Sequence, residues 1–179
     1  PRSAGAGRGG RGADPGSGGR GHPGVQYAPR RGFETVAVSR SSDRRDLAKD
    51  LGADPFLDAS ATDPAERLQE LGGARVVLGT APSAPAIEAV AGGLGRDGEL
   101  VAVGVPGREV SVDVQGLVGN RASVGGWGSG HARDSQDTME FSALRDVTPE
   151  VETYDLADAG EAYDRMMANE ARFRAVLEP

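Results

Sequence analysis

Short apolar runs alternate regularly with amphipathic helical segments from about residue 25 onward. Strands are predicted at 35–39, 56–57, 74–79, 98–104, 109–114, 122–126, 151–154 and 173–177. Helices are predicted between them, at about 42–51, 63–71, 83–94, 134–145 and 156–169. The strands are continuously apolar, which is typical of a parallel sheet covered by helices on both faces. The sequence therefore predicts a doubly wound α/β domain, whose ligands bind beyond the carboxyl ends of the strands.

Capping and stop signals agree with several of these helix ends. The pair Asp63-Pro64 combines an N-cap aspartate with a proline at the first helical position. Ser41 or Ser42 can cap the helix predicted at about 42–51, and Gly52 is well placed to end it.

The first 24 residues have a different composition, rich in Gly, Arg, Ser and Pro and almost without large apolar side chains. Such a segment cannot build a core, so we expect a poorly ordered head over 1–24. A dinucleotide-binding domain is expected over 25–145. The segment 146–179 is expected to form a strand-helix-strand unit.

Charge is distributed unevenly along the chain. Residues 1–31 hold six arginines and one aspartate, whereas the whole chain carries a net charge of −7. The body is therefore acidic, which argues against a nucleic-acid-binding domain. We do not favour the hypothesis that "GRGGRG" (7–12) binds RNA, because the chain has no aromatic residue before Tyr27 on which a base could stack.

The chain contains no cysteine and only two histidines, His22 and His131. A disulfide framework and a thiolate metal site are excluded, and a histidine-rich zinc site is not expected. No apolar run is long enough to cross a membrane, and no secretory signal is recognisable. We expect a soluble cytoplasmic protein.

The stretch "GSGGRG" matches the pattern G-x-G-x-x-G at Gly16, Gly18 and Gly21. Such a turn lets the backbone approach a pyrophosphate at a helix N-terminus. Its context is poor, because "GRGADP" before it does not read as a strand and Pro29 disfavours a helix after it. A flexible Gly/Arg tail remains the alternative interpretation.

The end of the predicted strand 35–39 carries Ser39 and Arg40, where dinucleotide-binding folds often place an acidic residue. A carboxylate there would repel a 2′-phosphate, whereas a serine hydroxyl and an arginine fork can bind one. The pair therefore predicts a preference for NADP(H) over NAD(H). The alternative is that Arg40 is a solvated surface charge.

Seven segments together resemble the C-terminal half of a zinc-type medium-chain alcohol dehydrogenase of the cinnamyl-alcohol-dehydrogenase-like group. They cover about nine-tenths of the chain in family order: "GGRGHPGVQYA" (18–28), "FETVAVSRSSDRRDLAKDLGAD" (33–54), "LGTAP" (78–82), "LVAVGVPG" (100–107), "GGWGSG" (125–130), "DSQDTMEFSA" (134–143) and "EAYDRMMANEARFRAVL" (161–177). The resemblance implies a Rossmann-like fold, a nicotinamide cofactor and a small alcohol or aldehyde substrate. It also implies that 146–179 returns toward the family's catalytic domain.

The resemblance assigns cofactor contacts to six groups of residues along the chain. These are Gly18, Gly19 and Arg20 by the pyrophosphate; Ser39 and Arg40 by the adenosine phosphate; Thr80 and Ala81 by the adenine side and the cofactor's spine; Val103, Gly104 and Val105 by the nicotinamide; Gly128 and Ser129 by its ribose; and Arg174 by the phosphates. Structural alternatives stay open: Thr80 as a strand end, Val103 as core, Ser129 as a turn residue, and Arg174 as the partner of a surface acid.

The chain also departs from the pattern of the family. Family members carry Cys, His and Glu ligands for the catalytic zinc in an N-terminal half, and no such residues are recognisable here. We therefore expect no catalytic residue and no metal ligand in this chain, and no activity from it alone. The head has the character of a truncated or frame-shifted start.

A non-catalytic module that binds a nucleotide or another subunit is the alternative function. Family members pair near the strand "ASVGG" (122–126), so a homodimer is also expected.

Overall fold

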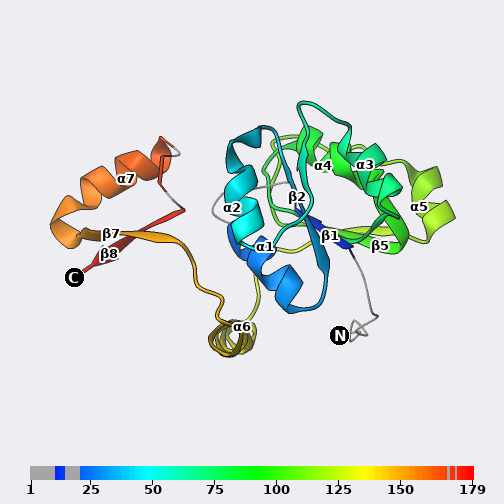
Figure 1. Cartoon of the computed structure of the whole chain (residues 1–179). Helices are drawn as coiled ribbons and strands as arrows, with labels where there is room; N and C mark the ends of the chain where they lie inside the picture. The colour runs from blue at the N-terminus through cyan, green and yellow to red at the C-terminus, as the bar shows by residue number, and fades with distance from the viewer. Residues whose placement is uncertain (1–10, 15–20, 169, 172) are drawn as a thin grey trace.

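A computed structural model describes residues 11–14, 21–168, 170–171 and 173–179 (Figure 1). Six strands form one sheet in the order β3-β2-β1-β4-β5-β6, and every neighbouring pair is parallel. The strands are β1 (Arg11–Asp14), β2 (Glu34–Ser39), β3 (Phe56–Asp58), β4 (Ala74–Gly79), β5 (Leu94–Ala102) and β6 (Ser123–Gly126). This arrangement confirms the doubly wound α/β fold, with the reversal of strand order between β1 and β4.

Helices cover both faces of this sheet, because parallel strands need crossover connections. The helices of the domain are α1 (Gly21–Arg30), α2 (Arg45–Asp50), α3 (Pro64–Glu70), α4 (Ala84–Ala91) and α5 (Val114–Asn120), with a 3₁₀ turn η1 (Ser42–Arg44) before α2. Helix α3 begins at the predicted cap, where the Asp63 carboxylate accepts the N–H groups of Ala65 and Glu66 at 2.8 and 3.1 Å. Gly52 has a φ of +106° just after α2, as its predicted role as a helix stop requires.

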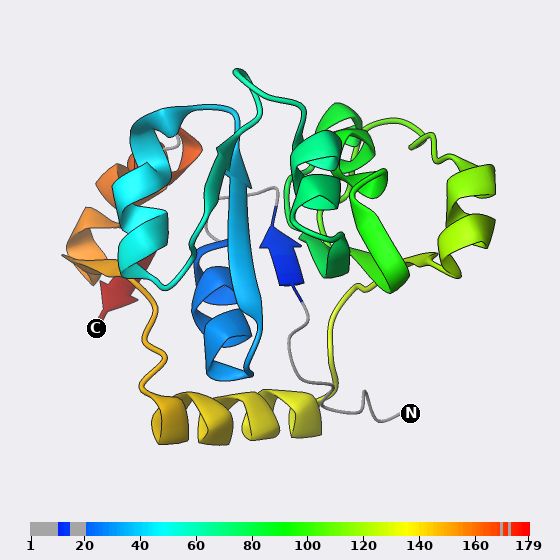
Figure 2. The ribbon, with the colours of Figure 1, turned by 45° about the vertical axis from the view of Figure 1, so that its right-hand side comes forward.

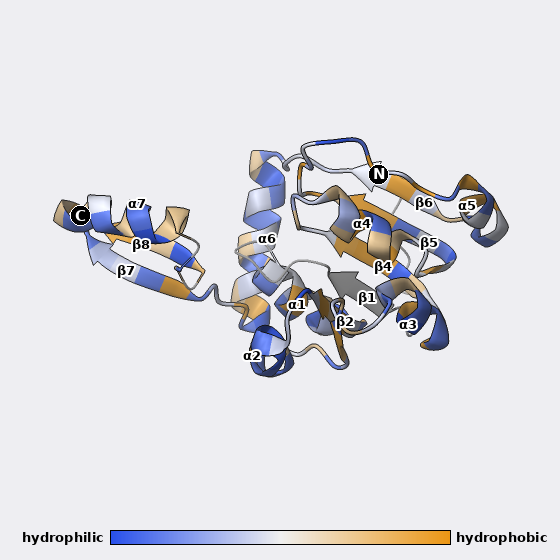
Figure 3. Ribbon diagram, turned by 90° about the horizontal axis from the view of Figure 1, so that it is seen from above, coloured by the Kyte–Doolittle hydropathy of each residue, from blue (hydrophilic) through white to orange (hydrophobic). Residues whose placement is uncertain are grey.

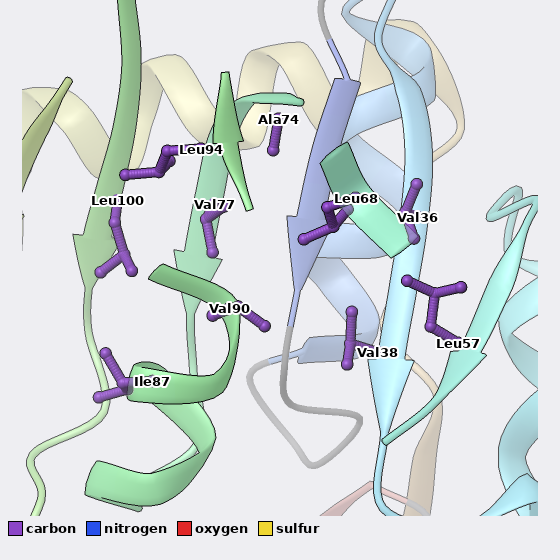
Figure 4. Close-up of a cluster of buried hydrophobic side chains, with 10 residues drawn as sticks. All are labelled: Val36, Val38, Leu57, Leu68, Ala74, Val77, Ile87, Val90, Leu94 and Leu100. Carbon is purple, nitrogen blue, oxygen red and sulfur yellow. The ribbon is translucent and has the colours of Figure 1, made fainter. Parts of the chain in front are cut away.

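The core is split by the sheet into two clusters. Figure 4 shows the larger one, in which Leu68 of α3 and Ile87 and Val90 of α4 pack over β2, β4 and β5. The smaller cluster lies under α1 and α2 and includes Val25 and Ala48. Strand β2 serves both clusters, since Val36 and Val38 face the larger one and Ala37 the smaller one. Burial on both faces explains why β2 is apolar at every central position.

The structure corrects the interpretation of the head. Residues 11–14, expected to lie in a poorly ordered segment, form β1, which pairs with β2 from Arg11↔Glu34 and with β4 from Gly12↔Val76. A central strand gains main-chain hydrogen bonds on both edges, so it needs no apolar run of its own to form. Helix α1 also forms despite Pro29, which is its ninth residue and lies in the last turn.

The predicted strand at 109–114 is wrong. Residues 109–113 have no regular structure, and α5 begins at Val114 with Asp113 accepting the N–H of Gln115 at 3.0 Å. The edge of β5 that faces away from β4 is occupied by β6, which pairs with it over four residues. Along Glu99–Ala102 of β5, no sheet edge is therefore left for a further strand.

Helix α6 (Ala132–Arg145) and a strand-helix-strand unit complete the chain. Strands β7 (Val151–Asp155) and β8 (Arg174–Glu178) are parallel, and η2 (Leu156–Asp158) and α7 (Ala159–Met167) connect them. This confirms the predicted C-terminal strand-helix-strand unit. Figures 1 and 3 show it to one side of the six-stranded sheet, beyond α6.

The segment 145–150 runs antiparallel along α1, and three α1 side chains four residues apart bind its main chain. Arg30 donates to the carbonyls of Arg145 and Asp146 at 2.7 and 3.1 Å, and Gln26 donates to the carbonyl of Thr148 at 3.0 Å. His22 Nε2 accepts the N–H of Glu150 at 3.2 Å. These residues share one helix face, so they act as a ladder that ties the C-terminal part of the chain to α1. Figure 2 shows α6 crossing below α1 at the start of this segment.

His22 forms the last rung of the ladder and is buried. Its ring stacks on Phe173 with the centroids 4.5 Å apart. Because Nε2 accepts a hydrogen bond, the imidazole is neutral with its proton on Nδ1, and burial, reinforced by the nearby Arg174, lowers the pKa of His22. Glu150 opposes this shift.

We predict that His22 makes the folded state sensitive to acid. The unfolded chain binds a proton at its ordinary imidazole pKa before the folded chain does, so stability falls as the pH drops through about 6.5. Urea unfolding from about pH 7.5 to about pH 5.5 should therefore show a smaller loss of stability in His22→Gln than in the wild type. His131→Gln, which removes the exposed histidine, should keep the wild-type slope. Equal slopes in His22→Gln and the wild type would contradict the prediction.

Candidate functional site

The carboxyl ends of the parallel strands open on a single edge of the sheet. The predicted residue Ser39 ends β2 and Arg40 follows it, Thr80 and Ala81 follow β4, Val103–Val105 follow β5, and Gly128 and Ser129 follow β6. Residues far apart in the sequence are thus gathered where doubly wound folds bind ligands. Gly21 opens α1, whereas Gly16, Gly18, Gly19 and Arg20 lie outside the described residues.

A cleft of about 260 Å³ lies at this edge between the end of β2 and the start of α4. Ser39 and Arg40 border it on one side, and Ser83, Pro85 and Ala86 on the other. Arg40 is exposed and has no ion-pair partner within the described part of the chain. A fork of N–H donors beside a hydroxyl and apolar walls suits a flat ring that carries a phosphate.

A carboxylate lies in the turn after this arginine. Ser41 Oγ donates to Asp43 Oδ2 at 3.1 Å, which holds Asp43 in the first turn after β2. The site thus carries charges of both signs within a few residues.

The exits of β4 and β5 touch through their main chains. The N–H groups of Val103 and Gly104 both donate to the carbonyl of Gly79, at 3.0 and 2.9 Å. A Cβ on Gly104 would lie 2.4 Å from the Ala81 carbonyl oxygen and 2.7 Å from that of Thr80. Only glycine fits there, so Thr80, Ala81 and Gly104 form one tightly packed unit.

Thr80 of this unit and Val105, which follows Gly104, differ in exposure. Thr80 is buried, whereas the Val105 side chain is 81% exposed. The loop that leaves β5 therefore exposes an apolar side chain directly after Gly104.

Three residues at this edge are absent from the sequence-based prediction. The Glu88 carboxylate on α4 accepts from Arg108 Nη1 and Nη2, each at 2.8 Å, and from the Ser111 N–H at 2.9 Å. The Arg108 hydrogen bonds, reinforced by that N–H, lower the pKa of Glu88 to about 2. No local pattern could have identified the pair, because 20 residues separate the partners.

Trp127 is a further residue that the prediction missed. Its main-chain N–H donates to the Ala102 carbonyl at 2.9 Å, and the residue is 62% exposed. This bond fixes the chain just before Gly128 and Ser129 against the end of β5.

Arg174 is the first residue of β8, far from the other predicted residues in sequence. It follows Phe173, which stacks on His22, and it contributes to the lowered pKa of His22. The guanidinium is therefore close to the start of α1, where the dipole of a helix favours anions.

The described residues do not fit a zinc site. Among them, no group of three or more His, Cys, Asp or Glu side chains could hold a metal ion. None of the described helices is long and apolar enough to cross a membrane. A cytoplasmic location stays a prediction.

The chain matches one family model, described as "Zinc-binding dehydrogenase", over residues 19–144. It is 40% identical over 162 residues to alcohol dehydrogenase patD of Penicillium expansum, covering 90% of this chain and 47% of that protein. It is 30% identical to cinnamyl alcohol dehydrogenase 2 of Arabidopsis thaliana, covering 91% of this chain and 43% of that protein. The chain thus spans about half the length of these curated relatives.

Solved structures agree with the sequence relatives. The alcohol dehydrogenase of the archaeon Aeropyrum pernix superposes with a TM-score of 0.82 at 27% identity, covering 96% of this chain and 51% of that one. A cinnamyl alcohol dehydrogenase of Sorghum bicolor gives a TM-score of 0.77 at 26% identity, covering 96% of this chain and 48% of that one.

We predict that Gly104→Ala destabilises the fold by about 1–3 kcal/mol, because the new methyl group would collide with carbonyl oxygens that cannot move independently of β4. Urea unfolding of the purified chain measures this. Gly107→Ala is the matched control on the same loop, since a Cβ there meets nothing within 4 Å. Equal stabilities of the two variants would show that the exits of β4 and β5 are not in tight contact.

Proposed function

Since the chain belongs to the zinc-binding dehydrogenase family, as the C-terminal half of a medium-chain alcohol dehydrogenase, we propose that it is the NADP(H)-binding part of such an enzyme. Family members use a nicotinamide cofactor and zinc. The observation that carries the proposal is the gathering of Arg40, its adjoining cleft and the Gly104 contact at one sheet edge. The complete enzyme would interconvert a small alcohol and its aldehyde.

The edge has the features that a dinucleotide needs. Ser39 and Arg40 would hold the 2′-phosphate, and Thr80 and Ala81 would line the adenine side and the cofactor's spine. Gly104 leaves the backbone bare where Val103 and Val105 would meet the nicotinamide. Gly128 and Ser129 would approach the ribose beside that ring. The start of α1, with Gly18, Gly19, Arg20 and Arg174, would meet the pyrophosphate.

The chain's own residues bind and orient in this proposal. When bound, the nicotinamide supplies or accepts a hydride. The exposed Val105 would cover an apolar ring and exclude water from it. The charge-assisted hydrogen bonds of Arg40 would fix the opposite end of the cofactor.

We propose that these 179 residues alone transfer no hydride. Alcohol oxidation in this family relies on a Lewis acid at the alcohol oxygen. The sequence offers no thiolate, and one of its two histidines is buried against Phe173. The zinc does not fit here, and no step of this proposal involves it.

A module that binds a nucleotide or another subunit, without chemistry, is the second candidate. The C-terminal unit favours it, because Leu156, Tyr163, Met166 and Met167 are each at least half exposed. We propose that 146–179 packs against the catalytic domain of the complete enzyme, while 25–145 binds the cofactor.

We predict that the chain binds NADPH more tightly than NADH and that Arg40→Asp removes the difference. Losing charge-assisted hydrogen bonds worth about 1.5–3 kcal/mol should weaken NADPH binding by about 10- to 100-fold and leave NADH binding unchanged. Calorimetric titration measures both. Arg96→Asp makes the same charge change at the amino end of β5 and should bind like the wild type. Equal affinities of the wild type for NADPH and NADH would refute the preference.

We also predict a homodimer through β6 and α5. All four residues of β6 are exposed, and Val118 of α5 is 74% exposed. Sedimentation velocity should detect a dimer in the wild type and a monomer in Val118→Lys/Val124→Lys. Leu144→Lys, at an exposed position on α6, should remain dimeric. A monomeric wild type at all accessible concentrations would contradict this prediction.

A further inference from the structure

The loop that joins β5 to α5 is anchored at two points although it has no regular structure over 103–113. At its start, the N–H groups of Val103 and Gly104 bind the Gly79 carbonyl. Further along, Arg108 and Ser111 bind the carboxylate of Glu88 on α4. Only three residues, 105–107, separate Gly104 from Arg108, so this short segment is held from both sides.

The second anchor is a strong one for a surface contact. Both Glu88 oxygens accept from the guanidinium fork, and one of them also accepts the Ser111 N–H. Arg108 Nη1 donates in addition to the Glu109 carbonyl at 2.7 Å, which keeps the fork in place. The Glu88 side chain is only 25% exposed. A paired fork of this kind loses little to side-chain freedom once formed.

The held segment carries Val105, whose side chain is 81% exposed. Without the anchors this segment would have more conformations open to it, and the direction of the Val105 side chain would not be fixed. The two anchors therefore keep Val105 at the carboxyl edge of the sheet.

We infer that Glu88 is a positioning residue for the nicotinamide end of the site: through Arg108 and Ser111 it holds the segment 104–107 so that Val105 faces the cofactor. This inference rests on the function proposed above. Glu88 acts through the loop and touches no reacting atom.

The position of Glu88 on α4 predicts that its loss affects one half of the cofactor and not the other. Pro85, Ala86 and Ala89 of the same helix line the cleft beside Arg40, whereas Glu88 is not among the residues that line it. The loss of Glu88 should therefore affect only the nicotinamide half of the cofactor.

The test compares two probes. NADPH spans the whole site, and adenosine 2′,5′-bisphosphate carries the phosphate end without the nicotinamide. In Glu88→Ala and in Arg108→Ala, calorimetry should show NADPH affinity lowered about fivefold and bisphosphate affinity unchanged. Glu88→Gln, which keeps an acceptor for the Ser111 N–H, should recover part of the NADPH affinity.

Amide hydrogen exchange of the free protein provides a second readout. Exchange at 104–111 should become faster in Glu88→Ala, while exchange in β4 and β5 stays at the wild-type rate. Glu70→Ala is the matched control, because it breaks an exposed Arg–Glu pair with Arg67 on α3, away from this loop.

Three results would overturn the inference. Equal losses for both probes would mean that Glu88 supports the fold as a whole. Unchanged NADPH affinity in Glu88→Ala, with the wild type binding well, would refute the positioning role alone. If the wild type binds neither probe, the proposed function fails and the inference fails with it.

Discussion

Parallel pairing of six strands is the constraint on which the rest of this structure depends. It directs the ends of β2, β4, β5 and β6 to one edge and forces each connection to cross the sheet as a helix. Both faces are then covered by helices, and the edge is where doubly wound folds bind their ligands. The site residues are neighbours because of this topology, although more than 60 positions separate Ser39 from Val103.

Close main-chain contact then gives the edge its shape. The meeting of Gly104 with Thr80 and Ala81 brings two loops together without side chains between them. The Glu88–Arg108 pair secures the second loop from the outside. A rigid edge of this kind loses little conformational freedom when a ligand binds, which favours affinity.

Sequence patterns predicted the elements whose own side chains form the core. Strand β2 was recognisable because both of its faces are buried, and α3 because Asp63 and Pro64 mark its start. Strand β1 was missed because it has no apolar run of its own. Pairing with its two neighbours, β2 and β4, makes it a strand. The segment 109–114 was misread because an apolar alternation cannot reveal that β6 already occupies the sheet edge. At the site, the strand ends could be predicted, but the Glu88–Arg108 contact depends on how two distant segments meet.

The ladder along α1 has an evolutionary consequence. Its rungs are hydrogen bonds that join the side chains of His22, Gln26 and Arg30 on α1 to main-chain atoms of 145–150. Mutational tolerance across this contact should therefore be asymmetric. Positions in 145–150 can change in identity, except the buried Val147, Asp146 with its φ of +51°, and changes that remove the amide of Glu150, whereas a change on the helix removes a rung outright. Divergent relatives would keep this junction by retaining polar side chains four residues apart on the helix. The segment that faces them could differ in its residue types from one relative to the next.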